Sequence, residues 1–434
     1  MGLAIRSLLV IGSIALLGAC SSNDSAVVAA PPSAPLAKTA KLQVVHAVAN
    51  APTVSVGNAA STLVSGLDFK ETSGFATLVA GTLAIQVDAD VPGGQATVIP
   101  LTDVVLAADM TYSVLAIGEV DSLANPISPL IIGNPDVPIG AGNVRVEIVH
   151  GAPGAPPVDI HVTGPADPLV PANAIAGGST AFGSNSGQLE VPAGDYRIRV
   201  ALPGTTTTVF DSGTVTLPAG ADLLVVAVDN TVAGHTAIDA PPITLLVSNG
   251  ASTFEILDVA TPAEVRVVHA VPDAPAVDVY INDSMATNAP PIAGLGYAQA
   301  FPMPVVAGPD AYAALEPGTN NVLVTVAGNP GAIAIPPTDL DLTAGRQYSV
   351  YASGTLATIA PFVREDDDRS IATEARVRII HLAPSAGLVD VYVTAVGTDI
   401  SNENPAIEDV DFQADTGYLS LAGMPYDVTV TLAG

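Results

Sequence analysis

Histidine and aspartate residues recur in this chain at a spacing that could serve acid–base catalysis or metal binding. The motif that contains them occurs four times, as KLQVVHAVANAPTVSV from Lys41, RVEIVHGAPGAPPVDIHV from Arg145, EVRVVHAVPDAPAVDVYI from Glu264, and RVRIIHLAPSAGLVDVYV from Arg376. The motif histidines are His46, His150, His269 and His381. An aspartate follows nine residues later in three copies, as Asp159, Asp278 and Asp390. Ser55 takes this place in the first copy, and His161 adds a further candidate metal ligand in the second.

The alternation of apolar and polar residues predicts the face of the strand on which each side chain lies. Residues four and two before each histidine are apolar, and residues five and three before it are polar. Because successive strand side chains point to opposite faces, each histidine is expected to face inward, and the aspartate beyond the Ala/Pro turn outward. Asp159 and His161 share the outward face, but two ligands are too few for a closed zinc site.

These considerations predict no catalytic residue, no metal site and no cofactor. The motif histidines are interpreted as structural residues at strand ends, hydrogen-bonded to turn backbone beside the core. No nucleophile elbow, phosphate-binding loop or complete dinucleotide fingerprint is present, so the chain is not expected to be an enzyme.

The repeats predict an all-β fold of tandem antiparallel, immunoglobulin-like β-sandwich modules. The intervals between the motif histidines are 104, 119 and 112 residues, which is the size of a whole small domain. Each copy continues as short alternating runs broken by Pro, Gly, Asn and Asp, without a helical period. Tyr112 and Tyr348 open a strand just after a turn, where a tyrosine corner lies in immunoglobulin-like folds; plain core packing is the alternative, and Leu223 takes this place in the second copy.

The expected modules are three complete sandwiches and one partial one. Their boundaries are residues 41–142, 143–262, 263–374 and 375–434. The fourth copy lacks the L-x-A-G turn and the last strands that follow it in the others. Two explanations fit this: a fragment of a longer reading frame, which we favour, or a module with an unpaired edge that another strand must cover.

The N-terminus predicts export and lipid attachment. Residues 1–20 read as a signal peptide, with Arg6 before a short apolar stretch that ends in Leu-Gly-Ala-Cys. This ending resembles the bacterial lipobox, which implies diacylglyceryl attachment at Cys20, the only cysteine of the chain. Residues 21–40 form a Ser/Ala/Pro tether. Ser21 and Ser22 after the cysteine favour the outer membrane, by resemblance to Gram-negative lipoproteins.

The charge of the chain limits its partners. The formal net charge is −29 with 13 basic residues, so nucleic acid and anionic lipid headgroups are repelled. An acidic surface is typical of a soluble exported protein. The acidic run at residues 365–368, between the third and fourth copies, is interpreted as a solvated linker, with calcium binding at a module junction as the alternative.

The repeat RVVHAVPDAPAVDVYIND from Arg266, with its partner LTAGRQYSV from Leu342, resembles the bacterial family of domain of unknown function 4397. The resemblance covers nearly everything after Ala40, and the first copy departs from it at Ser55 and Gly57. It implies tandem immunoglobulin-like domains in exported, lipidated surface proteins. The family has no established activity, so the resemblance transfers no functional residue.

Two functions remain as expectations. The first is a non-enzymatic surface protein, held in the cell envelope by its lipid, that presents modules to an unknown extracellular or envelope ligand for adhesion or envelope structure. The alternative is an extracellular lipoprotein that binds glycan or peptide through loops at one end of each sandwich, with or without calcium. Aromatic residues make up only 4% of the chain, which weakens the glycan version.

Overall fold

The structure is a computed structural model that describes residues 37–58, 61–175, 179–231, 242–282, 284–302 and 312–434. The predicted signal peptide, Cys20 and the tether up to residue 36 lie outside the described residues. From Lys38 to Gly434 the chain forms one compact unit.

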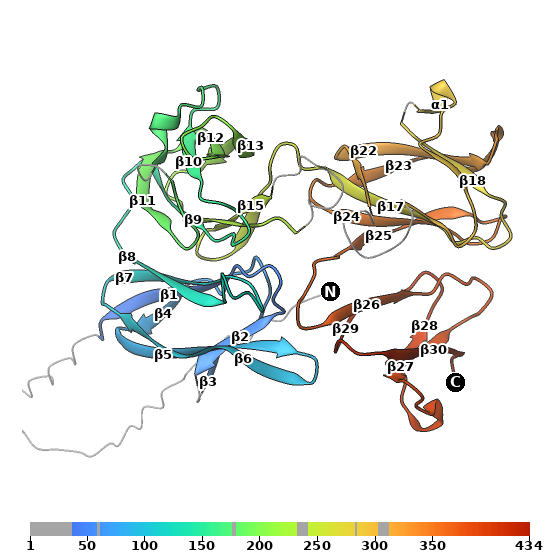
Figure 1. Ribbon diagram of the computed structural model, residues 1–434, viewed down its shortest axis with the longest axis horizontal. Helices are drawn as coiled ribbons and strands as arrows, with labels where there is room; N and C mark the ends of the chain where they lie inside the picture. The colour runs from blue at the N-terminus through green and yellow to red at the C-terminus, as the bar shows by residue number, and fades with distance from the viewer. Residues whose placement is uncertain (1–36, 59–60, 176–178, 232–241, 283, 303–311) are drawn as a thin grey trace, which may run out of the picture. The chain divides into compact units, whose positions relative to one another are not determined.

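Nearly all of the described secondary structure is β, in four successive modules (Figure 1). Module 1 contains β1 (Thr39–His46), β2 (Val54–Asn58), β3 (Ser61–Leu67), β4 (Ala76–Val79), β5 (Gly81–Val91), β6 (Gly94–Leu106), β7 (Met110–Ile117) and β8 (Ser128–Pro135). Module 2 contains β9 (Asn143–His150), β10 (Asp159–Thr163), β11 (Asn185–Pro192), β12 (Gly194–Ala201), β13 (Thr208–Leu217), β14 (Asp222–Asp229), β15 (Ile243–Ser248) and β16 (Thr253–Ile256). The short 3-10 helix η1 (Pro171–Asn173) precedes β11.

Modules 3 and 4 continue the chain, and module 4 has no counterparts of β24 and β25 among the described residues. Module 3 contains β17 (Ala263–His269), β18 (Val277–Ile281), α1 (Ser284–Thr287), β19 (Ile292–Leu295), β20 (Ala300–Phe301), β21 (Ala313–Leu315), β22 (Gly318–Val326), β23 (Asn329–Leu342), β24 (Gln347–Ser353) and β25 (Ala360–Asp366). Module 4 contains β26 (Ala375–Ile380), β27 (Val389–Ala395), the 3-10 helix η3 (Ile400–Asn402), β28 (Ile407–Val410), β29 (Asp415–Leu421) and β30 (Tyr426–Leu432).

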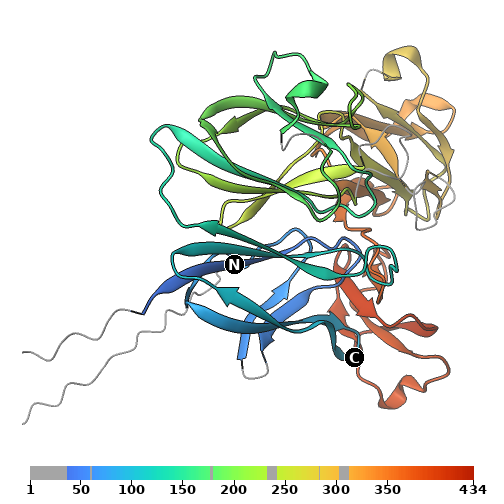
Figure 2. The same cartoon turned by 60° about the vertical axis from the view of Figure 1, so that its left-hand side comes forward.

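Each module is a sandwich of two small sheets, which confirms the predicted fold class. In module 1 the sheets have the orders β4-β1-β7-β8 and β3-β2-β5-β6; Figure 2 shows them, in blue to teal, as two facing layers. Module 2 has β11-β9-β14-β15-β16 with β10-β12-β13, and module 3 has β20-β17-β24-β25 with β19-β18-β22-β23. Module 4 has β26-β29 with β28-β27-β30.

One pairing in each of the first three modules is parallel, which the alternation pattern did not predict. The strand that ends in the motif histidine runs parallel to a later strand: β1 to β7, β9 to β14, and β17 to β24. Parallel neighbours need a crossover connection, and here the chain crosses over through the opposite sheet.

The core of each module consists of the residues that the alternation places inward. In module 2, Val146 and Ile148 on β9 pack with Val158 and Ile160 from the following segment and with Phe210 on β13, and all are less than 5% exposed. Burial of such a side chain contributes about 1.5–3 kcal/mol. A single cysteine allows no disulfide within the chain, so packing of this kind stabilises the modules.

Two tyrosines make the hydrogen bond of a tyrosine corner. The Tyr112 hydroxyl accepts from the backbone N–H of Ala107 at 2.9 Å, and the Tyr348 hydroxyl accepts from that of Thr343 at 3.2 Å. Gly133 on β8 leaves room for the Tyr112 ring, because a Cβ there would lie 2.8 Å from the ring. Leu223 of module 2 occupies the corresponding place in the core without such a bond.

We predict that Tyr112→Phe lowers the free energy of unfolding by about 1 kcal/mol, because the Ala107 N–H loses its acceptor. Urea unfolding at neutral pH measures this. Tyr196→Phe is the matched control: its hydroxyl donates to the Pro192 carbonyl at an exposed site, where water can replace it. Equal effects of the two substitutions would contradict a structural role for the Tyr112 hydroxyl.

Candidate functional site

The four motif histidines occupy equivalent, buried positions at the end of the first strand of each module. In each, Nε2 lies within hydrogen-bond distance of the carbonyl oxygen six residues later: 3.0 Å from Pro52, 3.1 Å from Pro156, 3.0 Å from Pro275 and 2.8 Å from Gly387. The first three imidazoles are at most 1% exposed, and that of His381 is 8% exposed. This bond joins the end of a strand in one sheet to the turn that leads into the other sheet.

The second ring nitrogen shows which tautomer of the imidazole is present. Nδ1 accepts the backbone N–H of the residue two positions later at 3.2 Å for His46, 3.2 Å for His269 and 3.3 Å for His381. Because an amide only donates, the proton of the neutral ring is on Nε2 and is donated to the turn carbonyl. In these three modules both ring nitrogens are therefore engaged by backbone. The His150 Nδ1 differs, in having no hydrogen-bond partner among the described residues.

An aromatic ring contacts each histidine edge to face. The partners are Phe69, Phe182, Tyr297 and Phe412, with ring centroids 6.3–6.5 Å apart and interplanar angles of 74–88°. The backbone beside the aromatic residue also pairs with the histidine, as in module 1, where the His46 N–H donates to Glu71 and the Lys70 N–H donates to His46.

Reasoning from the sequence missed these aromatic partners, although a signal was present. In modules 1, 2 and 4 the aromatic residue is followed, four and five positions later, by Ser/Thr and Gly. The hydroxyl accepts the backbone N–H of the residue two before the histidine, from Val44 to Ser73, Ile148 to Ser186 and Ile379 to Thr416, at 2.9–3.0 Å. The glycine has a positive φ of 67–68°, which favours glycine over other residues.

Burial keeps His46 neutral. Desolvation lowers the pKa of His46 to about 4, with the Pro52 hydrogen bond opposing the shift. Desolvation also lowers the pKa of His150. An imidazole that is neutral, buried and bonded to backbone is unsuited to proton transfer with a ligand.

We predict that the stability contributed by His46 is lost as pH falls from about 6.5 to about 4. In this window the unfolded state binds a proton that the folded state does not, so the free energy of unfolding rises with pH. Between pH 7 and pH 4.5 the wild-type chain should lose roughly 2 to 3 kcal/mol more than His46→Gln, whose amide keeps a donor for Pro52. Urea unfolding at both pH values tests this. Identical pH dependence in the two proteins would mean that the folded and unfolded imidazoles have the same pKa, and would contradict the role of burial.

The aspartates nine residues after the histidines bind other parts of the backbone. In module 3, Asp278 accepts the N–H groups of Gly294 and Gly328, both at 2.8 Å. Asp159 accepts the Gly204 N–H at 2.7 Å, and Asp390 accepts the Asp409 N–H at 2.9 Å. These carboxylates thus hold neighbouring hairpins, while the histidines hold the turn.

The candidate metal ligands do not assemble into a metal site. His161 is fully buried next to Asp159, and neither of its ring nitrogens has a hydrogen-bond partner in the described part of the chain. His150 is bonded to the Pro156 carbonyl instead. Among the described residues, no group of three or more His, Cys, Asp or Glu side chains could hold a metal ion.

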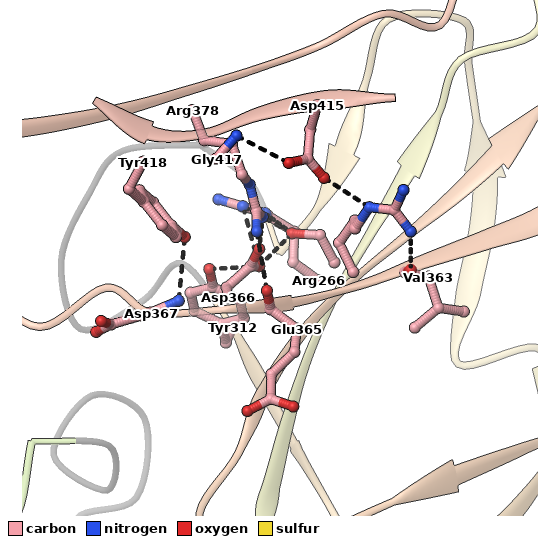
Figure 3. Close-up of polar contacts among 12 residues, drawn as sticks. Arg266, Tyr312, Val363, Glu365, Asp366, Asp367, Arg378, Asp415, Gly417 and Tyr418 are labelled. Atoms are coloured by element: carbon pink, nitrogen blue, oxygen red, sulfur yellow. Dashed lines mark hydrogen bonds and ion pairs between the residues drawn. The ribbon is translucent and has the colours of Figure 1, made fainter. Parts of the chain in front are cut away.

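A second polar cluster lies where β25 leads into module 4 (Figure 3). Asp366, whose side chain is 1% exposed, pairs with Arg378 and with Arg266 at 3.4 Å. It also accepts the hydroxyl of Tyr312 at 2.8 Å and that of Ser349. Burial raises the pKa of Tyr312 to about 12, so this phenol remains a donor at neutral pH.

Further pairs surround Asp366. Arg376 binds Asp367 at 2.8 Å, and the Asp367 N–H donates to the Tyr418 hydroxyl at 3.0 Å. The guanidinium groups of Arg376 and Arg378 lie 4.5 and 4.8 Å from the centroid of the Tyr418 ring. The expectation of a solvated acidic linker is therefore wrong for Asp366, since arginine and tyrosine side chains enclose it.

We predict that Asp366→Ala lowers the free energy of unfolding by about 3 kcal/mol or more, because Arg378 and Arg266 lose a buried carboxylate. Asp367→Ala is the matched control: the Asp367 side chain is half exposed, and its removal should cost less than about 1 kcal/mol. Urea unfolding of the two variants decides the matter. A loss at Asp366 no larger than that at Asp367 would show that the cluster does not stabilise the fold.

The interior of module 3 contains an apolar cavity of about 40 Å³ between its two sheets. Its walls include Val267, Val279, Leu295, Val324 and Ile335. A space of this size fits a few atoms and not a sugar or a peptide side chain.

The repeated motif, the buried histidines and the paired sheets define a protein of tandem β-sandwich modules. A model of the family described as domain of unknown function (DUF4397) matches residues 40–161 and 263–392, more than half of the chain. The chain belongs to this family, as the motif resemblance implied. No curated protein matches the sequence.

Two solved structures show weak similarity. The product complex of SpuA, a multi-modular glycogen-degrading pneumococcal virulence factor, has 10% identity and a TM-score of 0.16, over 68% of this chain and 37% of that chain. This chain thus spans little more than a third of that protein. A putative cell adhesion protein from Bacteroides ovatus has 13% identity and a TM-score of 0.19, over 53% of this chain and 96% of that one. TM-scores of this size carry no information on what this chain does.

The described residues include no helix that is both long and apolar enough to cross a membrane.

Proposed function

We propose that this chain is a non-enzymatic, lipid-anchored protein of the cell envelope that presents tandem β-sandwich modules for adhesion or envelope structure. The lipid on Cys20 would hold it at the outer membrane, and the tether would separate the modules from the anchor. The modules would contact an extracellular or envelope ligand and not nucleic acid, because the chain carries a net charge of −29.

The observation that supports this proposal is that the motif histidines make contacts within their own modules. The residues that recur most clearly in the sequence are bonded to turn carbonyls and packed against aromatic rings. The repeated motif thus builds modules, and the function of such an array rests on surfaces that the modules present.

We predict that Cys20→Ser abolishes lipid labelling and membrane attachment of the full chain. The wild-type and variant chains would be produced in a Gram-negative host that is fed labelled palmitate, and the cells then fractionated. The wild-type chain should be labelled and sediment with outer membranes, and the variant should be unlabelled. Ser21→Ala is the matched control and should retain the label. An unlabelled wild-type chain would contradict the lipid anchor.

Adhesion is tested on the same cells. Cells carrying the wild-type chain should bind to each other or to a host-cell layer more strongly than cells carrying Cys20→Ser at equal expression. Protease added to intact cells should remove the modules and this difference together. Equal binding by both cell types would contradict a role in adhesion and leave envelope structure as the function.

A further inference from the structure

In modules 1 to 3, the sheet that contains the motif histidine has a second face, which points away from the core of its own module. We call this the docking face; in module 1 it is the outward side of β1, β7 and β8. The alternation predicted polar, outward residues there. They do point outward, yet Gln43 and Glu147 are only 2% and 6% exposed. Residues outside their own module therefore cover these two side chains.

The docking faces of modules 1 and 2 cover each other. One apolar cluster takes members from both modules, and every member is less than 9% exposed: Val45, Ala47, Phe69, Leu115, Ile117 and Ile132 from module 1, and Val149, Leu224, Val226, Val228 and Leu246 from module 2. This cluster is separate from the two inner cores of module 1 and from the inner core of module 2.

The polar groups at this interface are paired across it. The Ser248 hydroxyl donates to Gln43 at 2.9 Å, and Asn134 donates to Glu147 at 2.6 Å. A backbone hydrogen bond of 2.8 Å joins the Phe75 N–H to the Gly250 carbonyl. An apolar centre with satisfied polar groups is typical of a permanent interface.

The corresponding surface of module 3 carries different residues at the same register. Ser113 of β7 pairs with Ile132 of β8, whereas the equivalent Ser349 of β24 pairs with Arg364 of β25. Likewise, Val45 lies beside Leu115, and the equivalent Val268 lies beside Tyr351.

This surface of module 3 contacts module 4 through charged and polar groups. Arg364 binds Asp415 at 2.7 Å and the Gln413 carbonyl at 2.9 Å, and Arg378 of module 4 binds Asp366. Among the described residues, no cluster of buried apolar side chains takes members from both modules. Arg364 and Asp415 are 33% and 21% exposed, so salt can screen this pair, whereas the Arg378 and Asp366 side chains are 10% and 1% exposed and their pair is screened much less.

We infer that the docking face of the histidine sheet is the surface through which successive modules associate in pairs. The residues of this face determine how stable the association of each pair is. Modules 1 and 2 are joined by apolar burial into one folding unit, whereas module 4 is held on module 3 by ionic contacts and can separate from it. The partner of each face is the neighbouring module of the same chain.

The experiment is urea unfolding of the full chain, followed module by module with hydrogen–deuterium exchange at about 0.05 M and about 1 M NaCl. Modules 1 and 2 should lose protection at the same urea concentration at both ionic strengths, because apolar burial is not screened. Module 4 should lose protection before module 3, and salt should widen the gap, because the Debye length falls to about 3 Å at 1 M.

A substitution in module 1 provides the second readout. Leu115→Ala should speed exchange of the most protected amides of modules 1 and 2 by the same factor, on the order of a hundredfold. Val105→Ala, the matched control, removes the same kind of group from a residue of β6 that is 67% exposed and should change neither module.

Three results would overturn the inference. The first is unfolding of modules 1 and 2 at different urea concentrations. The second is an effect of Leu115→Ala that stays within module 1. The third is a module 4 whose unfolding does not respond to salt.

Discussion

The hydrogen bond from a buried imidazole to a carbonyl oxygen six residues later is the contact on which each module depends. It links the last residue of a strand in one sheet to the turn that carries the chain into the other sheet. In three modules Nδ1 accepts a backbone amide from the same turn, so a single side chain satisfies two buried backbone groups. The edge-to-face aromatic ring then closes the remaining side of the imidazole. No other residue type offers a donor and an acceptor on a flat, compact ring of this size, which accounts for the histidine in these three modules; His150 keeps only the bond from Nε2.

Much of this arrangement follows from alternation in the sequence. The alternation of apolar and polar residues predicts that Val146 and Ile148 lie in the core with residues of the strand after the turn. The structure confirms this. Alternation cannot show what lies beyond the outward face, because a polar residue such as Gln43 suits both water and a buried polar contact. The aromatic partners were missed for another reason: Phe69 and Phe412 lie more than twenty residues from their histidines, in segments of variable length. Only their common Ser/Thr-Gly sequence could have identified them.

The acidic run before module 4 shows how context changes the meaning of a charge pattern. Four consecutive carboxylates suggest solvent or calcium, yet Asp366 is the last residue of a strand and points at two arginines. Arg266 is 100 residues away in the sequence, and Arg378 is 12 residues away on the first strand of module 4, so the acidic run by itself reveals neither partner. The neighbouring Asp367 remains half exposed. One residue of the run therefore organises the junction, while its neighbour lies at the surface.

The parallel strand pair has a consequence for how each module is completed. The first strand of a module and its parallel neighbour are 70, 77 or 83 residues apart in the sequence. The pairs Gln43 and Ser113, Arg145 and Asp222, and Glu264 and Gln347 show these separations. Contacts of such long range form slowly, and until they form one edge of the strand is open. The late strands of the other modules have similar sequences and could occupy that edge. Leu223 in place of a tyrosine distinguishes the late strand of module 2 from those of modules 1 and 3.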